Sequence, residues 1–145
     1  MQIREITPED RECWLALRSE LWPRYDISQL REEIEQFLAE RDNWALFFAL
    51  VDEKPVGFVE CRLRDTAAGC STHGVGYLEG WYVAEAHRGR GLGGALVAAA
   101  EEWARARGAT EMASDTTTEY PVSRAAHAAL GFEEVKRRFL FRKEL

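Results

Sequence analysis

Residues 84–109 read "AEAHRGRGLGGALVAAAEEWARARGA". Four glycines lie within six residues, two arginines lie among them, and a helix-forming run follows. Glycines let a backbone approach a ligand closely, and the first amides of a helix have no partner within that helix. The stretch therefore predicts an anion-binding turn at the start of a helix, in which the helix dipole favours the bound negative charge.

Two familiar phosphate loops fit this stretch poorly. A P-loop is excluded because no Gly-Lys-Ser/Thr follows at the required spacing. Gly89, Gly91 and Gly94 spell the dinucleotide pattern GxGxxG, and Asp115 lies about 20 residues further on, as that pattern requires. However, five residues separate Gly89 from the expected strand end at Val83, and the rest of the chain cannot supply a doubly wound sheet. A dinucleotide enzyme is the weaker alternative.

The composition limits the class of protein. The chain has 145 residues, which is the size of one domain, and 46% of them are hydrophobic. The net charge of −6 disfavours nucleic acid and favours a cationic ligand. No apolar run has the length of a membrane span, and the first residues are not a signal peptide. The three cysteines and three histidines show no metal-ligand spacing, so we expect reduced thiols, no metal and a cytoplasmic protein.

The hydrophobic pattern predicts a mixed α/β (α+β) sheet protein. Thr7 is expected to cap a helix that runs to about Trp22, because Pro8 follows it and Asp10 stands three residues after it, near a capping-box pattern. Further helices are expected over 26–41 and 122–130, and from the glycine turn to about Arg107. The expected strands cover residues 2–6, 43–51, 56–64, 76–83, 110–115 and 132–143. The strands that flank the helix after the glycine turn are expected to be parallel neighbours.

Residues 88–93 fit the pattern R/Q-x-x-G-x-G/A, which resembles the coenzyme A signature of the GNAT acetyltransferase superfamily. The resemblance implies a single GNAT domain over residues 1–145, with a mixed, mostly antiparallel sheet and splayed central parallel strands flanked by helices. It also implies acetyl-CoA as co-substrate, with the Val83 amide facing the thioester carbonyl. The residues expected to bind the coenzyme are Trp81, Tyr82, Val83, Arg88, Gly89, Arg90, Gly91, Leu92, Gly93 and Gly94. A glycine-rich helix entry without a ligand is the alternative.

Further motifs are similar to those of aminoglycoside 6′-N-acetyltransferases. They are "LWP" at 21–23, "YLEGWYV" at 77–83, "EMASD" at 111–115 and "H-x-x-LGFEE" at 127–134. The resemblance implies transfer of acetyl to the 6′-amine of an aminoglycoside antibiotic, which confers resistance. It also implies a homodimer, because proteins of this family commonly form one. The apolar residues "FLF" at 139–141 are candidates for that interface.

Two carboxylates are the candidates for the acceptor side. Strand alternation places Tyr77, Glu79, Trp81 and Val83 on one face, and Asp115 ends the next strand, where ligands of open sheets bind. We expect Asp115, with Glu79 second, to take the proton of the amine or to hold the ammonium. The alternatives are a salt-bridged strand residue for Glu79 and a turn cap for Asp115.

The resemblance also assigns Trp22, Asp65 and Tyr120 to the acceptor site, together with the two carboxylates. A core position is the alternative for Trp22. Three positions differ from the family pattern, namely Thr66, His73 and Tyr120, and all lie on the acceptor side. They leave the range of acceptors open. Phe132 stands where many superfamily members place an acidic tyrosine, so no general acid is named for the leaving thiolate.

Two other functions remain. One is an acetyltransferase for another polyamine or for a protein amine. The other is an acyl-CoA-binding module without catalysis, which has no need of the two carboxylates.

Overall fold

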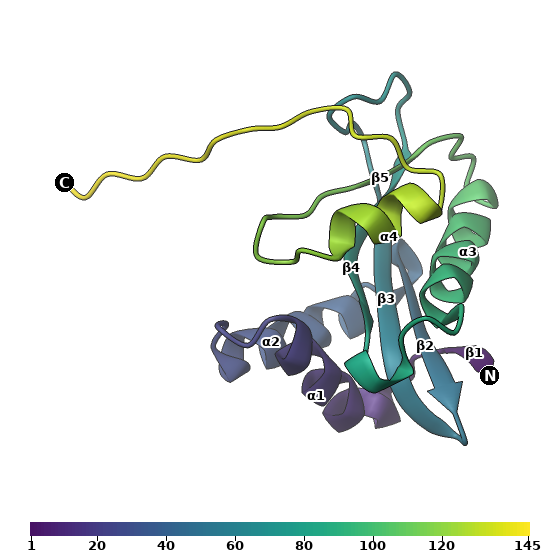
Figure 1. Ribbon diagram of the computed structural model, residues 1–145. Helices are drawn as coiled ribbons and strands as arrows, with labels where there is room; N and C mark the ends of the chain where they lie inside the picture. Colours follow the sequence, from purple (N-terminus) through teal and green to yellow (C-terminus); the bar gives the residue numbers. More distant parts are fainter.

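The computed structural model describes all residues from 1 to 145 and has one five-stranded sheet with helices on both faces (Figure 1). The strands are β1 (Gln2–Glu5), β2 (Trp44–Val51), β3 (Lys54–Arg64), β4 (Val75–Val83) and β5 (Met112–Ser114). The α-helices are α1 (Arg11–Leu21), α2 (Ile27–Ala39), α3 (Leu92–Arg105) and α4 (Ser123–Ala129). Short 3-10 turns η1, η2 and η3 cover Pro8–Asp10, Arg41–Asn43 and Glu85–His87.

The strands lie in sequence order, β1-β2-β3-β4-β5. Every neighbouring pair is antiparallel except β4 and β5, which are parallel and are joined through α3. The expected mixed, mostly antiparallel sheet is thereby confirmed. A parallel pair needs a crossover connection, and α3 with the glycine turn before it provides that connection.

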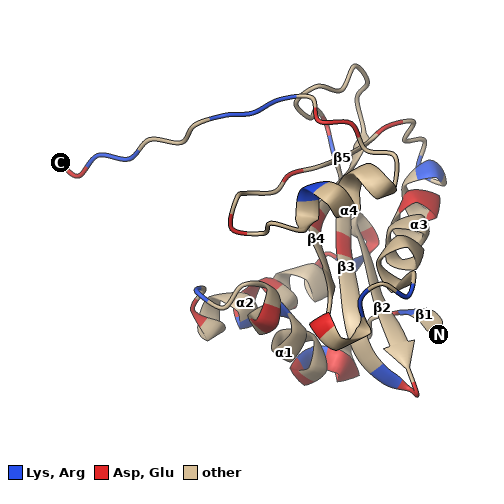
Figure 2. Cartoon of the chain, viewed as in Figure 1, with Lys and Arg blue, Asp and Glu red and all other residues tan.

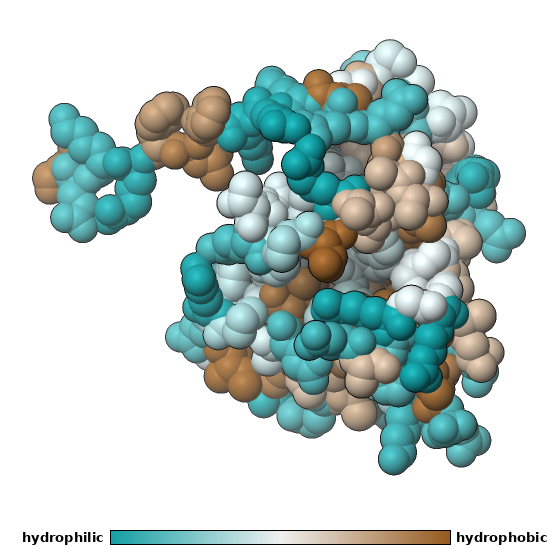
Figure 3. Space-filling model, in the orientation of Figure 1, coloured by the Kyte–Doolittle hydropathy of each residue, from teal (hydrophilic) through white to brown (hydrophobic).

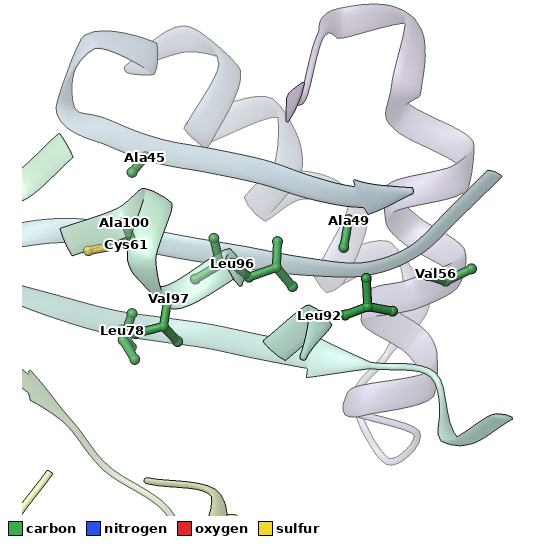
Figure 4. Packing of buried hydrophobic residues seen from close by; sticks show 10 residues of the cluster. Ala45, Ala49, Val56, Cys61, Leu78, Leu92, Leu96, Val97 and Ala100 are labelled. Carbon is green, nitrogen blue, oxygen red and sulfur yellow. The ribbon is translucent and has the colours of Figure 1, made fainter. Parts of the chain in front are cut away.

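Helix α3 covers one face of the sheet (Figure 4). Its side chains Leu92, Leu96, Val97 and Ala100 are buried against small and branched residues of the strands. The strand residues of this cluster are Ala45, Ala49, Val56, Val59, Cys61 and Leu78. This packing fixes the direction of α3, and therefore the direction of the amides at its start.

Helices α1 and α2 cover the opposite face of the sheet (Figure 1). The buried side chains of this second cluster are Ile6, Trp14, Leu15, Leu17, Leu30, Ile34, Leu46, Phe48 and Phe58. At the entry to α1, the Asp10 carboxylate accepts a hydrogen bond from the Thr7 amide at 2.8 Å, as the sequence pattern of a capping box predicts. None of the helices is long and apolar enough to cross a membrane.

Strands β4 and β5 pair over three residues and then separate. Gly76, Tyr77 and Leu78 pair with Met112–Ser114, and no pairing follows. In the same place β4 has a β-bulge against β3, because Leu78 pairs with Cys61 but Gly80 pairs with Glu60. The splayed parallel strands expected from the family resemblance are therefore present.

The bulge changes which side chains share a face. An extra residue in one strand reverses the alternation after it. The expectation that Tyr77, Glu79, Trp81 and Val83 share one face is therefore wrong. Trp81 and Val83 pack with Leu78 against the α3 cluster, whereas Tyr77 packs in a separate cluster of the other face.

The expected last strand, residues 132–143, is absent. Residues 132–145 have no regular secondary structure, and the end of the chain extends away from the domain (Figure 1). Phe139, Leu140 and Phe141 are 87%, 81% and 94% exposed. The apolar and basic alternation of this segment is compatible with a strand, but a strand forms only where a second strand supplies hydrogen bonds. Helix α3 also ends earlier than expected, at Arg105, and Gly108 follows with φ +89°.

Candidate active site

A cleft of about 700 Å³ opens where β4 and β5 separate. It is lined by the end of β4, the glycine turn, the residues after β5, helix α4 and the end of α1. The face seen in Figure 3 is hollowed here, and apolar atoms line part of the hollow. The cleft therefore joins the predicted coenzyme residues, except Arg90, to the predicted acceptor residues, except Asp65.

The glycine turn forms one end of this cleft. Gly89 and Gly91 have φ values of +74° and +81°, which favour glycine. The first hydrogen bond of α3 joins the Ala95 amide to the Gly91 carbonyl. The amides of Leu92 and Gly93 therefore have no acceptor within the helix and are free for a ligand. Figure 2 shows basic residues along this turn.

Trp81 ties β4 to the glycine turn. Its Nε1 donates to the Gly93 carbonyl at 3.1 Å, and a Cβ on Gly93 would lie only 3.2 Å from the indole ring. Glycine at this position thus allows close packing of the ring on the first turn of α3. Gly94 has a similar role against α4, since its Cβ would lie 3.4 Å from Leu130.

The backbone of Val83 faces the open side of β4. The Ala84 amide donates to the Val56 carbonyl of β3 at 2.8 Å, so the preceding residue turns its own amide and carbonyl away from β3. The Val83 carbonyl accepts from Arg88 Nε at 2.8 Å on that side. The side chain of Tyr82 points to the α1 face, where its hydroxyl donates to Glu20 at 2.7 Å.

Asp115 lies at the other end of the cleft. Its carboxylate accepts a hydrogen bond from the Tyr77 hydroxyl. Burial, and then the bond to Asp115, raises the pKa of Tyr77 to about 12, so the tyrosine stays protonated and remains a donor. The Arg64 guanidinium lies 3.5 Å from the centre of the Tyr77 ring. Asp115 is thus held at the end of β5 by a fixed donor.

Glu79 lies at the bulge of β4 and also lines the cleft. Arg62 donates to its carboxylate at 2.9 Å, and Arg64 donates to both oxygens at 2.7 and 2.8 Å. Two guanidinium groups therefore offset its negative charge. The carboxylate nevertheless keeps a side-chain exposure of 20%, which leaves it open to a ligand.

Trp22 packs over Gly80, at the floor of the cleft. A Cβ on Gly80 would lie 2.9 Å from the Trp22 ring and 2.9 Å from a carboxylate oxygen of Glu60. The buried Arg18 guanidinium lies 4.8 Å from the Trp22 ring centre and 3.5 Å from Glu60. The tryptophan therefore lines the cleft and also covers a buried ion pair.

The other two predicted acceptor residues are placed differently. Tyr120 lines the cleft, and its hydroxyl donates to the Leu21 carbonyl at 3.2 Å, which ties the segment after β5 to the end of α1. Asp65 does not line the cleft. It lies in the loop after β3, 85% exposed, with its carboxylate 3.0 Å from His73 Nδ1.

The polar residues of the cleft that the sequence analysis did not single out are His87, Ser114, Thr116, Thr117, Glu119, Ser123 and His127. Two of them, Ser114 and His127, form a pair. The His127 Nε2 lies 2.8 Å from Ser114 Oγ. Because the two are 13 positions apart in the sequence, no local pattern joins them; the only sequence signal is that each stands inside a motif quoted above.

The fold and the cleft agree with the comparison of the chain with known families. The family described as "Acetyltransferase (GNAT) family" matches residues 4–132. The chain therefore belongs to the GNAT family of acetyltransferases.

Relatives place the chain more closely. An aminoglycoside N(6′)-acetyltransferase type 1 of Klebsiella aerogenes is 42% identical over 99% of this chain and 96% of its own length. The structure of AAC(6′)-Iy with the bisubstrate analogue CoA-S-monomethyl-acetylneamine has a TM-score of 0.90 at 36% identity, covering 99% of this chain and 98% of the other. AAC(6′)-IG from Acinetobacter haemolyticus, without ligand, has a TM-score of 0.91 at 34% identity, covering 100% and 99%. Within the GNAT family the chain belongs with the aminoglycoside N(6′)-acetyltransferases, so the predicted fold and family are confirmed.

The glycine turn generates the first prediction. We expect Gly91→Asp to abolish the binding of acetyl-CoA, because the new side chain and its charge would meet the pyrophosphate at the helix start. Gly108→Asp is the matched control, since Gly108 also has a positive φ and open space but lies at the far end of α3. Calorimetric titration measures both, with circular dichroism for the fold. Wild-type affinity in a folded Gly91→Asp protein would contradict the assignment, and parallel titration of NADH tests the dinucleotide alternative.

Proposed function

We propose that the protein transfers the acetyl group of acetyl-CoA to the 6′-amine of aminoglycosides, and so confers resistance to these antibiotics. The observation that carries this proposal is the continuity of one cleft from the amides of the glycine turn to the carboxylate of Asp115. An acetyltransferase must bring a thioester and an amine together away from bulk water, and this cleft has a site for each.

The coenzyme side has the groups that a pyrophosphate and a pantetheine arm require. The amides of Leu92 and Gly93 and the positive end of the α3 dipole face the phosphates. The arm runs along the open edge of β4, where the Val83 amide and carbonyl lack a strand partner. When the arm binds, the amide polarises the thioester carbonyl as an oxyanion-type donor. When the coenzyme binds, the Arg88 side chain breaks its hydrogen bond with the Val83 carbonyl and binds the phosphates instead.

The acceptor side suits a polycation with a flat apolar face. Asp115 and Glu79 supply negative charge, and Trp22 supplies a ring on which a sugar can pack. Glu119 also lines the cleft and adds a third carboxylate, which is paired with Arg24 at 2.7 Å. Figure 2 shows acidic residues along the segment after β5. A hydrogen bond to a charged group contributes about 1.5–3 kcal/mol to binding. Two such contacts would therefore make the cleft bind an acceptor with ammonium groups much more tightly than a neutral one.

The two carboxylates have different tasks in this proposal. Asp115, held by one neutral donor, takes the ammonium of the acceptor and orients the amine towards the thioester. Glu79 shares its charge with two arginines, so it contributes to acceptor binding more than to proton transfer.

Kinetics of two isosteric variants test these tasks. We expect Asp115→Asn to lower turnover at least about tenfold, with acetyl-CoA affinity unchanged, because misplacement of a reacting group can cost about a hundredfold. We expect Glu79→Gln mainly to raise the Michaelis constant for the aminoglycoside. Normal kinetics in both variants with the best amine would make the two residues structural only.

The acceptor itself is tested with a thiol-release assay and mass spectrometry of the product. We expect rapid acetylation of kanamycin or tobramycin and none of a close analogue with a 6′-hydroxyl. The Michaelis constant for the antibiotic rises with salt, because salt screens the attraction between ammonium and carboxylate. Equal acetylation of both compounds would move the reaction to another amine. Activity on spermidine or a peptide without activity on any aminoglycoside would establish the alternative acetyltransferase.

We infer that the protein works in the cytoplasm as a homodimer. Its free cysteines, Cys13, Cys61 and Cys70, suit a reducing compartment. The exposed apolar residues 139–141 suit a surface that a second copy covers. The apolar atoms at the extended end of the chain are visible in Figure 3. Water contact of three neighbouring large apolar side chains is unfavourable, and burial in a second copy removes it.

The dimer is tested by light scattering during size-exclusion chromatography. We expect the wild-type protein to have twice the mass of one chain, and the Phe139→Asp/Phe141→Asp variant to be a monomer. Ile27→Asp is the control, because Ile27 is also apolar and exposed but lies on α2. A dimer in the double variant, or a monomer in the wild type, contradicts the inference.

A further inference from the structure

The imidazole of His127 lies in the cleft between β5 and α4. It forms T-shaped pairs with the Trp81 ring, with centroids 5.1 Å apart and planes at 89°, and with the Phe132 ring, with centroids 5.4 Å apart. Its two nitrogens have different partners. Nε2 lies 2.8 Å from Ser114 Oγ, and Nδ1 lies 2.7 Å from the Ser123 carbonyl oxygen and 3.3 Å from Ser123 Oγ. The ring is therefore fixed by packing and by both nitrogens.

These partners determine the tautomer. The shorter contact of Nδ1 is with a carbonyl oxygen, which can only accept, so Nδ1 carries a hydrogen and donates it to the Ser123 carbonyl rather than to the more distant hydroxyl. In the neutral ring Nε2 then has a lone pair, and the Ser114 hydroxyl donates to it. The lone pairs of Ser114 Oγ remain free on the cleft side, since the structure gives this oxygen no other partner.

The Ser114–His127 pair lies between the two halves of the site. Ser114 directly precedes Asp115, which holds the acceptor amine in the proposed function. His127 contacts Trp81, whose Nε1 is bonded to Gly93 of the coenzyme turn. The reacting nitrogen, carbon and sulfur must meet between these two halves. The pair is thus connected to both halves, through the chain to Asp115 and through ring packing to Trp81.

From this geometry, and resting on the proposed function, we propose that Ser114 and His127 form a proton relay between the attacking amine and the leaving thiolate. The ammonium held at Asp115 first loses one proton to solvent. The neutral amine then attacks the thioester carbon, a C–N bond forms, and the carbonyl electrons move to oxygen. Ser114 Oγ accepts the proton that the nitrogen must lose, while its own proton passes to His127 Nε2. The imidazolium is stabilised by the Ser123 carbonyl.

The second half of the reaction returns the proton. The carbonyl re-forms, the C–S bond breaks, and its electron pair leaves on sulfur. The imidazolium then gives its proton back through Ser114 to the sulfur, which leaves as a thiol. One amine and one thioester give one amide and one thiol, and the pair ends as it began. Ser114 touches the reacting atoms, and His127 acts through it.

The relay explains proton transfer better than a carboxylate does. Model imidazoles have a pKa of about 6.5 and model aspartates one of about 3.9, so an imidazole is the better base near neutral pH. Asp115 in addition already accepts the Tyr77 hydroxyl.

Ser114→Ala and His127→Phe test the relay, since phenylalanine keeps the aromatic packing on Trp81 and Phe132. We expect each variant to lower kcat by about a hundredfold, and the double variant to be no slower than either, because the two residues act as a unit. Arg124→Gln, a surface change on the same helix, is the control. Calorimetry with acetyl-CoA and circular dichroism confirm binding and fold.

Acetyl-seleno-CoA as donor distinguishes a relay from a merely structural role, because a structural defect lowers kcat equally with both donors. A selenolate leaves without a proton, so we expect the loss in both variants to shrink at least about tenfold with this donor. An equal loss with both donors, an additive double variant, or wild-type kcat in either single variant overturns the relay. The comparison uses whichever amine the wild-type protein acetylates fastest. A wrong acceptor therefore contradicts the proposed function while the relay is still tested.

Discussion

The short pairing between β4 and β5 is the constraint on which the rest of the site depends. Two parallel strands that stay paired leave no space between them, but here pairing ends after Leu78, where the bulge at Glu79 redirects β4. The backbone of β4 beyond this point is left without a strand partner on one side. Such unpaired groups are unfavourable inside a protein unless a ligand or a side chain binds them, and Arg88 partly does so at Val83.

The floor of the acceptor end depends on a second unfavourable feature, a buried ion pair. Burial raises the pKa of Glu60, and the Arg18 guanidinium and the Trp14 indole, which donates at 2.8 Å, lower it. Burial is the larger effect, so the pKa of Glu60 is raised to about 7. Buried pairs of this kind add little to stability. Arg18, however, also lies against the ring of Trp22, and Gly80 leaves room for that ring. The pair therefore fixes the orientation of a tryptophan that the acceptor has to contact.

The local features of the site could be predicted from the sequence, and the features that depend on distant pairing could not. The glycine turn, the helix after it and the Thr7 cap each depend on residues within one or two helical turns, so their patterns were sufficient. The bulge at Glu79 depends on the register with β3, which no alternation pattern contains. The prediction of a strand at 132–143 was wrong for the same reason, because the sequence pattern does not show whether a neighbouring strand is available to pair with it. His127 was missed because Ser114 reaches it only in the folded chain.

Binding and chemistry make opposite demands on the acceptor amine. A carboxylate beside an ammonium stabilises the protonated form, which raises the pKa of the amine and opposes the loss of the proton that attack requires. Asp115 alone would therefore bind the acceptor well and activate it poorly. The bound ammonium therefore gives its first proton to solvent before attack. The neutral hydroxyl next to that carboxylate takes no part in the attraction and accepts the second proton once the C–N bond forms, when the nitrogen has become a far stronger acid. Adjacent residues of one strand end, Asp115 and Ser114, thus separate the two demands in space.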